Sequence, residues 1–150
     1  MTPKHLVDVH VLFLRDDEIL LSKRRSPDEF DGSWHLPAGK LEPGESATAA
    51  AAREAMEEVG VTLDPAELEL IHVSHVVAPH LPARLGLFFR TRRWIGEPDN
   101  REPDKCYELR WFPLEALPEQ VISYSLNGIH AHRTGAPYSE LGWSGRRSES

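Results

Sequence analysis

Three glutamates, Glu54, Glu57 and Glu58, crowd one turn of the stretch GKLEPGESATAAAAREAMEEVGV, residues 39–61. At about 100° per residue, a helix places the three side chains on an arc roughly 100° wide. Like charges at the i,i+4 spacing of Glu54 and Glu58 oppose helix formation by roughly 0.2–0.5 kcal/mol. A divalent cation would offset this repulsion, and Mg²⁺ typically binds one or two carboxylates together with substrate phosphates. The spacing therefore favours a metal site that handles phosphates.

An exposed acidic helix face is the alternative interpretation, with Arg53 paired to Glu57 at i,i+4. For any one glutamate taken alone this alternative is the better one, because charged residues mostly solvate surfaces. The joint pattern shifts the balance, because all three carboxylates would stand on rigid helical backbone directly after a tight Gly-containing loop.

The elements that must position these glutamates can be read from the flanking sequence. Residues 6–14 and 18–25 read as two strands of a hairpin, and residues 26–46 are too rich in Pro and Gly for regular structure. We expect a helix over 47–58, with Ser46 as its N-cap and Gly60 as its C-terminal stop.

The second half predicts more strands and one more helix. Residues 68–77 and 83–94 and the segment YELRWF carry strand signals, and 95–105 is a polar loop. The segment PLEALPEQVISYSLNGIHAHR predicts a short turn and then a helix, with Ile122, Leu126 and Ile129 along one stripe. A mixed sheet flanked by helices, of the α/β class, is the natural packing for this order.

The chain reads as one domain over 1–134, followed by a Gly-, Ser- and Pro-rich tail over 135–150. We expect this tail to be mobile, with a role in association as the alternative. The formal net charge of −7 argues against binding a nucleic-acid polymer or an acidic membrane. No apolar run reaches transmembrane length, the N-terminus is not a signal peptide, and the single Cys106 favours a reducing cytoplasm.

The glutamates belong to a longer motif. The chain carries all seven fixed residues of the Nudix box, G-x5-E-x7-R-E-U-x-E-E-x-G-U: Gly39, Glu45, Arg53, Glu54, Glu57, Glu58 and Gly60. Ala55 occupies the first apolar position of the box, where a larger residue is usual. The hairpin, SWHLPAGK and RWFPLEALP also resemble Nudix domains, so the likeness covers all but the tail. It implies an α/β/α sandwich with a mixed sheet between helices.

Nudix hydrolases cut diphosphate bonds in nucleoside diphosphates linked to another group, using Mg²⁺ or Mn²⁺ and an attacking water. The resemblance implies that Glu54, Glu57 and Glu58 are metal ligands. It favours Glu54 as the group that orients or deprotonates the water, although the choice among the glutamates stays open.

Other box positions acquire roles from the same resemblance. Arg53 is implied to fix the glutamates through salt bridges, and Glu45 to brace the loop against the helix. The tight loop at Ala38 and Gly39 is implied to offer a backbone carbonyl to the metal.

Family members often add a carboxylate from a later loop at no fixed spacing. Glu102, in DNREPDK between two predicted strands, is our candidate for this further catalytic carboxylate. Glu97 and Glu108 compete with it, and a solvated loop glutamate is an equally good interpretation.

Candidate substrate contacts lie before the box. Period-two geometry puts Lys23 and Arg25 on one face of their strand and Arg24 on the other, and similar proteins contact substrate phosphates here. Arg25 is the strongest of the three, because a guanidinium suits bidentate phosphate contact. Trp34, like Trp111, offers a surface for base stacking, although a core position is the more common role of tryptophan.

The compact domain looks most like the MutT-type enzymes, which convert a nucleoside triphosphate, or a modified one, to a nucleoside monophosphate and pyrophosphate. An ADP-ribose or nucleotide-sugar pyrophosphatase is the enzymatic alternative, and a non-hydrolysing nucleotide-binding sensor is the alternative of another class. The chain has no SQPWPFPxS-like array of the kind typical of NADH pyrophosphatases. The expected partner is a small-molecule nucleotide. The oligomeric state is open, with a homodimer among the alternatives.

Overall fold

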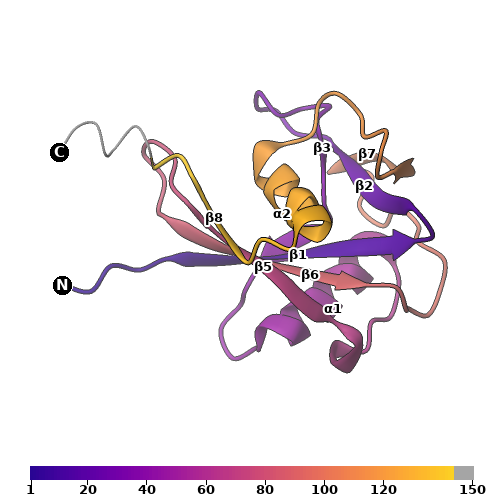
Figure 1. The fold of residues 1–150 in the computed structure, drawn as a ribbon, viewed down its shortest axis with the longest axis horizontal. Helices are drawn as coiled ribbons and strands as arrows, with labels where there is room; N and C mark the ends of the chain where they lie inside the picture. Colours follow the sequence, from indigo (N-terminus) through magenta and orange to yellow (C-terminus); the bar gives the residue numbers. More distant parts are fainter. Residues whose placement is uncertain (144–150) are drawn as a thin grey trace.

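The computed structural model describes residues 1–143 (Figure 1). Its elements in chain order are β1 (Leu6–Arg15), β2 (Glu18–Arg24), β3 (Trp34–His35), β4 (Ala38–Lys40), α1 (Ala47–Val59), the 3₁₀ turn η1 (Pro65–Glu67), β5 (Glu69–Val76), β6 (Arg84–Thr91), β7 (Cys106–Pro113), α2 (Ser123–Thr134) and β8 (Tyr138–Leu141).

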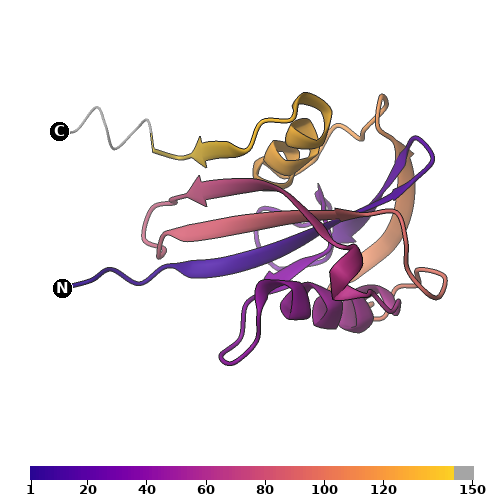
Figure 2. The same ribbon diagram turned by 60° about the horizontal axis from the view of Figure 1, so that its bottom comes forward.

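The strands form a mixed sheet around β1. β1 runs parallel to β6 and antiparallel to β4, β5 is antiparallel to β6, and β8 is parallel to β5. The far end of β1 pairs with β2, which carries β3 on one edge and β7 on the other. Figure 2 shows α1 and α2 on opposite faces of these strands. This arrangement confirms the predicted α/β/α sandwich.

Each face of the sheet has its own core because side chains alternate along β1. Val9, Val11 and Phe13 pack with α1, whereas Leu12 and Leu14 belong to the cluster that contains Ile129 of α2. The buried residues of α1 are small, and they are Ala50, Ala51, Ala55 and Val59. The alanine at the first apolar position of the box is therefore fully buried, and its size lets α1 approach the sheet closely.

The ends of α1 follow the predicted local signals. The Ser46 side chain accepts a hydrogen bond from the Ala49 N–H at 3.2 Å. Gly60 adopts a left-handed conformation with φ 71°, and its N–H donates to the Met56 carbonyl. Both predicted caps are confirmed, so α1 is fixed from its first turn to its last.

The tail differs from its prediction where the structure describes it. Tyr138–Leu141 form β8, which pairs in parallel with Val73–Val76 of β5, so a mobile tail beginning at Gly135 was wrong for this segment. Composition misled here because pairing with a distant strand outweighs a weak local preference. Residues 144–150 lie outside the described part of the chain. Neither helix within residues 1–143 has the length and hydropathy needed to span a bilayer.

Candidate active site

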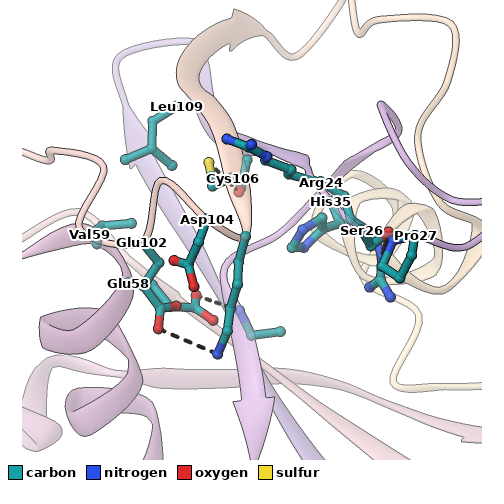
Figure 3. Close-up of a pocket in the computed structure, with 14 residues that line it drawn as sticks. Arg24, Ser26, Pro27, His35, Glu58, Val59, Glu102, Asp104, Cys106 and Leu109 are labelled. Carbon is teal, nitrogen blue, oxygen red and sulfur yellow. Dashed lines mark hydrogen bonds and ion pairs between the residues drawn. The ribbon is translucent and has the colours of Figure 1, made fainter.

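A cleft of about 450 Å³ opens where α1, β2, β7 and the loop before β7 meet. Figure 3 shows Glu58 and Glu102 on one side of it, and Arg24, His35 and Ser26 on the other. The cleft therefore places carboxylates opposite a guanidinium, which is the charge arrangement that a metal–phosphate complex requires.

Glu58 is partly buried. Its Oε2 accepts a hydrogen bond from the Ala38 N–H at 3.1 Å. Burial, followed by the nearby charges of Glu54 and Glu102, raises the pKa of Glu58 well above its usual value. Burial also raises the pKa of Glu54, against the opposing effect of Arg53, and the charges of Glu57 and Glu102 add to the rise. Glu54, Glu58 and Glu102 thus repel one another, and Glu57 adds to the repulsion at Glu54.

Glu102 owes its place to a loop anchored on the end of α1. The Asp99 N–H donates to the Val59 carbonyl at 2.9 Å, and the Arg101 N–H donates to the Glu58 carbonyl at 3.1 Å. These bonds satisfy carbonyls that have no partner within the last turn of α1. They also bring the next residue, Glu102, into the cleft.

The two competing glutamates lie elsewhere. Glu97 pairs with Arg15 at 3.1 Å and its side chain is 78% exposed. Glu108 sits on β7 and pairs with Arg110 at 2.9 Å. Neither lines the cleft, whereas Glu102 does.

Arg53 binds several carboxylates at once. Its guanidinium donates to Glu45 at 2.7 and 3.0 Å, to Glu54 at 2.7 Å and to Glu57 at 3.2 Å. The hydrogen bond to Glu45, and then that to Glu54, raises the already high pKa of Arg53, so its charge is permanent. Arg53 also donates to the Lys40 carbonyl at 3.1 Å, which ties α1 to the loop before it.

Gly39 leaves room for the side chain of Glu54. A Cβ at this position would lie 2.0 Å from Cδ and 2.2 Å from Oε1 of Glu54. A Cβ here would force the Glu54 carboxylate to move, so the glycine allows Glu54 to stand where it does. Ala38 meets the site through its N–H bond to Glu58.

The donor set fits a hard divalent cation, because it consists of oxygen atoms whose mutual repulsion a cation would relieve. Within residues 1–143, however, no three His, Cys, Asp or Glu side chains already stand in a metal-binding arrangement. Arg53 accounts for this difference: it holds Glu57, whose side chain is 51% exposed, away from the cleft while it also bonds Glu54. A side chain at this exposure can rotate toward a cation, so the donor chemistry remains suited to one.

The cations of the cleft differ from the predicted pair. Arg24 and Arg25 line it, together with Lys105 from the facing loop, whereas Lys23 does not. The pairing of β2 with β7 shifts register between Lys23 and Arg24, and this irregularity breaks the period-two alternation on which the prediction rested. The Lys23 ammonium instead lies 5.8 Å from the ring centre of Trp34.

The predicted stacking role of Trp34 is also wrong. Its residue exposure is 7%, and its ring packs edge-on against Phe112 at 4.8 Å in the core on the α2 side. Trp111 is covered by the guanidinium of Arg15 at 4.1 Å. Neither indole lines the cleft.

A second cavity of about 250 Å³ adjoins the cleft and shares Arg24, His35 and Ala38 with it. Its wall includes His10, whose two ring nitrogens have no hydrogen-bond partner. Burial lowers the pKa of His10 to about 3, so its imidazole is neutral. The Tyr124 hydroxyl donates to Asp8 at 2.9 Å in the same wall.

Sequence reasoning missed this cavity. Asp8 and His10 are charged or polar residues inside the apolar strand LVDVHVLFL, and both face the side that packs against α2. Polar residues within such an apolar strand were the available signal, because burying a polar group is costly unless it is hydrogen-bonded or paired.

The chain matches proteins of known family. A family model described as NUDIX domain matches residues 4–129. The NAD-capped RNA hydrolase NudC of Pseudomonas aeruginosa (strain LESB58) is 40% identical over 131 residues, which cover 84% of this chain and 44% of that protein. The 8-oxo-dGDP phosphatase NUDT18 of Homo sapiens is 28% identical over 136 residues, which cover 88% of this chain and 39% of that protein. The chain thus spans less than half the length of these curated relatives.

A solved structure is similar over nearly its whole length. The crystal structure of a MutT NUDIX hydrolase from Burkholderia pseudomallei superposes with a TM-score of 0.79 at 29% identity, covering 85% of this chain and 98% of that one.

Proposed function

Because the chain belongs to the Nudix hydrolase family, we propose that it hydrolyses a diphosphate bond in a nucleotide with the help of Mg²⁺ or Mn²⁺. One observation carries the proposal: Glu58 and Glu102 share a cleft with Arg24, Arg25 and Lys105. Carboxylates that repel one another favour a cation, and the arginines across the cleft from Glu58 favour an anion. A metal–diphosphate complex supplies both.

We propose Glu54, Glu57, Glu58 and Glu102 as the residues that would hold the metal, with the backbone at Ala38 and Gly39 adjoining them. A bound divalent ion would neutralise the diphosphate, polarise phosphorus and lower the pKa of the attacking water.

The protein's own groups have complementary tasks. Arg24 and Arg25 would neutralise phosphate oxygens across the cleft from Glu58, and Glu54 would orient or deprotonate the water. Lys105, whose ammonium lies 3.7 Å from the Glu102 carboxylate, would contact the phosphates from the loop before β7. Arg53 holds Glu54 through a bond of 2.7 Å and so fixes the direction from which the water can approach. Positioning and charge stabilisation of this kind carry most of phosphoryl-transfer catalysis.

The adjoining cavity supports a nucleotide as the substrate. Its Asp8, His10 and Tyr124 provide hydrogen-bonding groups and an aromatic wall next to the cleft, where the nucleoside part of the substrate would lie. We propose a (d)NTP, or a modified one, that yields a nucleoside monophosphate and pyrophosphate.

A dinucleotide is the second candidate. The NudC protein that is 40% identical to this chain acts, by its name, on NAD-capped RNA, and two joined cavities could receive the two halves of such a molecule. ADP-ribose and nucleotide sugars belong to the same class of substrate. We propose a small-molecule partner, because the formal net charge of −7 disfavours a polyanion. We propose a reducing cytoplasm as its compartment, because Cys106 is the single cysteine.

A substrate panel tests the proposal. The protein is incubated with ribo- and deoxyribonucleoside triphosphates, 8-oxo-dGTP, ADP-ribose and NAD, with and without Mg²⁺, and the products are identified by mass. We expect Mg²⁺-dependent cleavage of a diphosphate bond, with pyrophosphate released from a triphosphate. Saturable binding without turnover of any compound would instead assign the chain to the nucleotide-binding sensors.

A further inference from the structure

Two loops form opposite walls of the cleft, and Arg25 joins them. Arg25 follows β2 and begins the loop over residues 25–33, whereas Glu102 and Lys105 belong to the loop before β7. The Arg25 N–H donates to the Lys105 carbonyl at 2.9 Å, and its Nη1 donates to the Pro103 carbonyl at 3.2 Å. The position of this guanidinium is thus set relative to the loop that carries Glu102.

Tyr107 holds the same region from the other side. Its hydroxyl donates to Asp31 Oδ1 at 3.0 Å and to Oδ2 at 3.3 Å. Asp31 Oδ1 also accepts the Ser26 N–H at 3.1 Å, which draws the two ends of the loop together. The ring of Tyr107 lies 5.5 Å from the guanidinium carbon of Arg25, within cation–π range.

These contacts contribute little to the stability of the core. Tyr107 is 49% exposed, and Asp31 and Arg25 are also exposed. Hydrogen bonds and charge contacts at such positions are worth little to folding because water competes for them. Their common effect is geometric, since they restrict where the Arg25 side chain can lie. A guanidinium has five N–H donors, so the bond to Pro103 leaves others for a ligand.

We propose that Tyr107 and Asp31 are positioning residues that hold Arg25 in the wall of the cleft, so that it contacts the substrate's phosphates at a fixed distance from Glu102. The inference deepens the proposed function and rests on it for the identity of the ligand. Arg25 is the group that touches the phosphates, and Tyr107 and Asp31 act through it.

Tyr107→Phe is the sharpest test, because it removes the bond to Asp31 and keeps the ring beside Arg25. Tyr138→Phe is a matched control, since Tyr138 is 50% exposed and its hydroxyl also donates to a carboxylate, that of Glu140, on the edge strand β8. Asp31→Asn is a conservative variant whose amide oxygen can still accept both bonds, whereas Asp31→Ala cannot.

Two readouts are needed. KM and kcat are measured with the nucleotide that the protein hydrolyses, and the Kd of inorganic pyrophosphate is measured by calorimetry. We expect Tyr107→Phe and Asp31→Ala to raise both KM and Kd about threefold, the loss of one modest hydrogen bond. We expect kcat and the unfolding midpoint to stay unchanged, and Asp31→Asn and Tyr138→Phe to match the parent protein.

The decisive comparison uses Arg25→Ala. If Tyr107 acts through Arg25, Tyr107→Phe adds nothing to the KM and Kd of the Arg25→Ala protein. Equal effects of Tyr107→Phe with and without Arg25, or a lowered unfolding midpoint with unchanged KM, would overturn the proposal.

The outcomes separate the two proposals. Nucleotide hydrolysis without coupling between Tyr107 and Arg25 rejects the positioning role alone. Pyrophosphate binding that shows the coupling, in a protein that hydrolyses no nucleotide, rejects the proposed function alone. A protein that neither hydrolyses nucleotides nor binds pyrophosphate contradicts both.

Discussion

Glu58 combines partial burial, one backbone hydrogen bond and two carboxylate neighbours. A carboxylate in such surroundings is costly unless a cation or a proton compensates its charge. Glu57, in contrast, is half exposed and is held by Arg53. At the scale of residues, the box glutamates therefore have unequal environments although the motif treats them alike.

We predict that Glu58→Gln folds but hydrolyses its substrate at least about 100-fold more slowly in the presence of Mg²⁺, because the amide removes a metal-binding charge. Steady-state turnover and circular dichroism check this result. Glu42→Gln is the control, since the side chain of Glu42 is 62% exposed and only flanks Arg53 at 3.7 Å. Turnover like that of the parent protein in Glu58→Gln would refute its assignment as a ligand.

The later-loop carboxylate is tested by three parallel substitutions. We expect Glu102→Gln to lower kcat at least about tenfold, because Glu102 lies in the cleft and shares the field of Glu54 and Glu58. Glu97→Gln and Glu108→Gln should be neutral, since their carboxylates pair with arginines outside the cleft. A loss of kcat in one of these two, with Glu102→Gln unaffected, would reassign the role.

At the scale of elements, close approach determines where side chains can stand. α1 approaches the sheet through alanines, and Gly39 of β4 leaves the space that Glu54 occupies. A glycine also allows close packing on the other face of the sheet. A Cβ at Gly128 of α2 would lie 2.1 Å from Cδ1 of the buried Phe88. Both helices thus depend on the absence of a side chain at one contact.

Gly128→Ala tests this dependence with a clear sign. In a free helix the change would stabilise by up to about 1 kcal/mol, but overpacking against Phe88 costs roughly 1–3 kcal/mol. We expect the clash to win, with a lower free energy of unfolding in urea. Adding Phe88→Leu should recover part of the loss, and His130→Ala, at an exposed position of α2, should not destabilise. A more stable Gly128→Ala protein would contradict the packing.

At the scale of the whole molecule, two kinds of buried titratable group oppose each other. Burial lowers the pKa of His10 to about 3, and that of His35 is also lowered. Burial and mutual repulsion raise the pKa of Glu54 and Glu58. The folded protein resists protonation at the histidines and favours it at the glutamates. The two groups therefore change the free energy of unfolding in opposite directions as the pH falls, and a variant that lacks one group isolates its effect.

We predict that His10 makes the protein less stable as the pH falls from 6.5 toward 3. The unfolded chain takes up a proton at His10 near pH 6.5, whereas the folded protein does so only near pH 3, so the stabilisation is complete above 6.5 and is lost below it. The slope approaches about 1.4 kcal/mol per pH unit. Urea unfolding between pH 7 and 4 should show a shallower slope for His10→Phe, and no change for exposed His80→Asn.

Much of the fold followed from local patterns. Partial alternation predicted β1, and the interruption at Asp16-Asp17 predicted β2 as its hairpin partner. The helix over residues 47–59 was placed within one residue by its N-cap Ser46 and its stop Gly60. These features depend on neighbours within one or two turns, so spacing alone predicts them. The family likeness and the identity of the box glutamates came from the same kind of local information.

Errors arose where distant segments meet. The irregular pairing after Lys23 turned Arg24 toward the cleft, the packing of Phe112 buried Trp34, and pairing with β5 made a strand of residues 138–141. The sequence next to these positions does not predict such long-range contacts.

The sequence by itself determined that three glutamates share a helical turn after a glycine loop, because helical spacing is a property of the chain's own geometry. Only the tertiary structure decided that Glu102 joins them, that Arg24 and not Lys23 faces them, and that Tyr107 lies beside Arg25. These choices depend on strand register and loop anchoring. Register is set by the sum of many long-range contacts, and no local segment contains that sum.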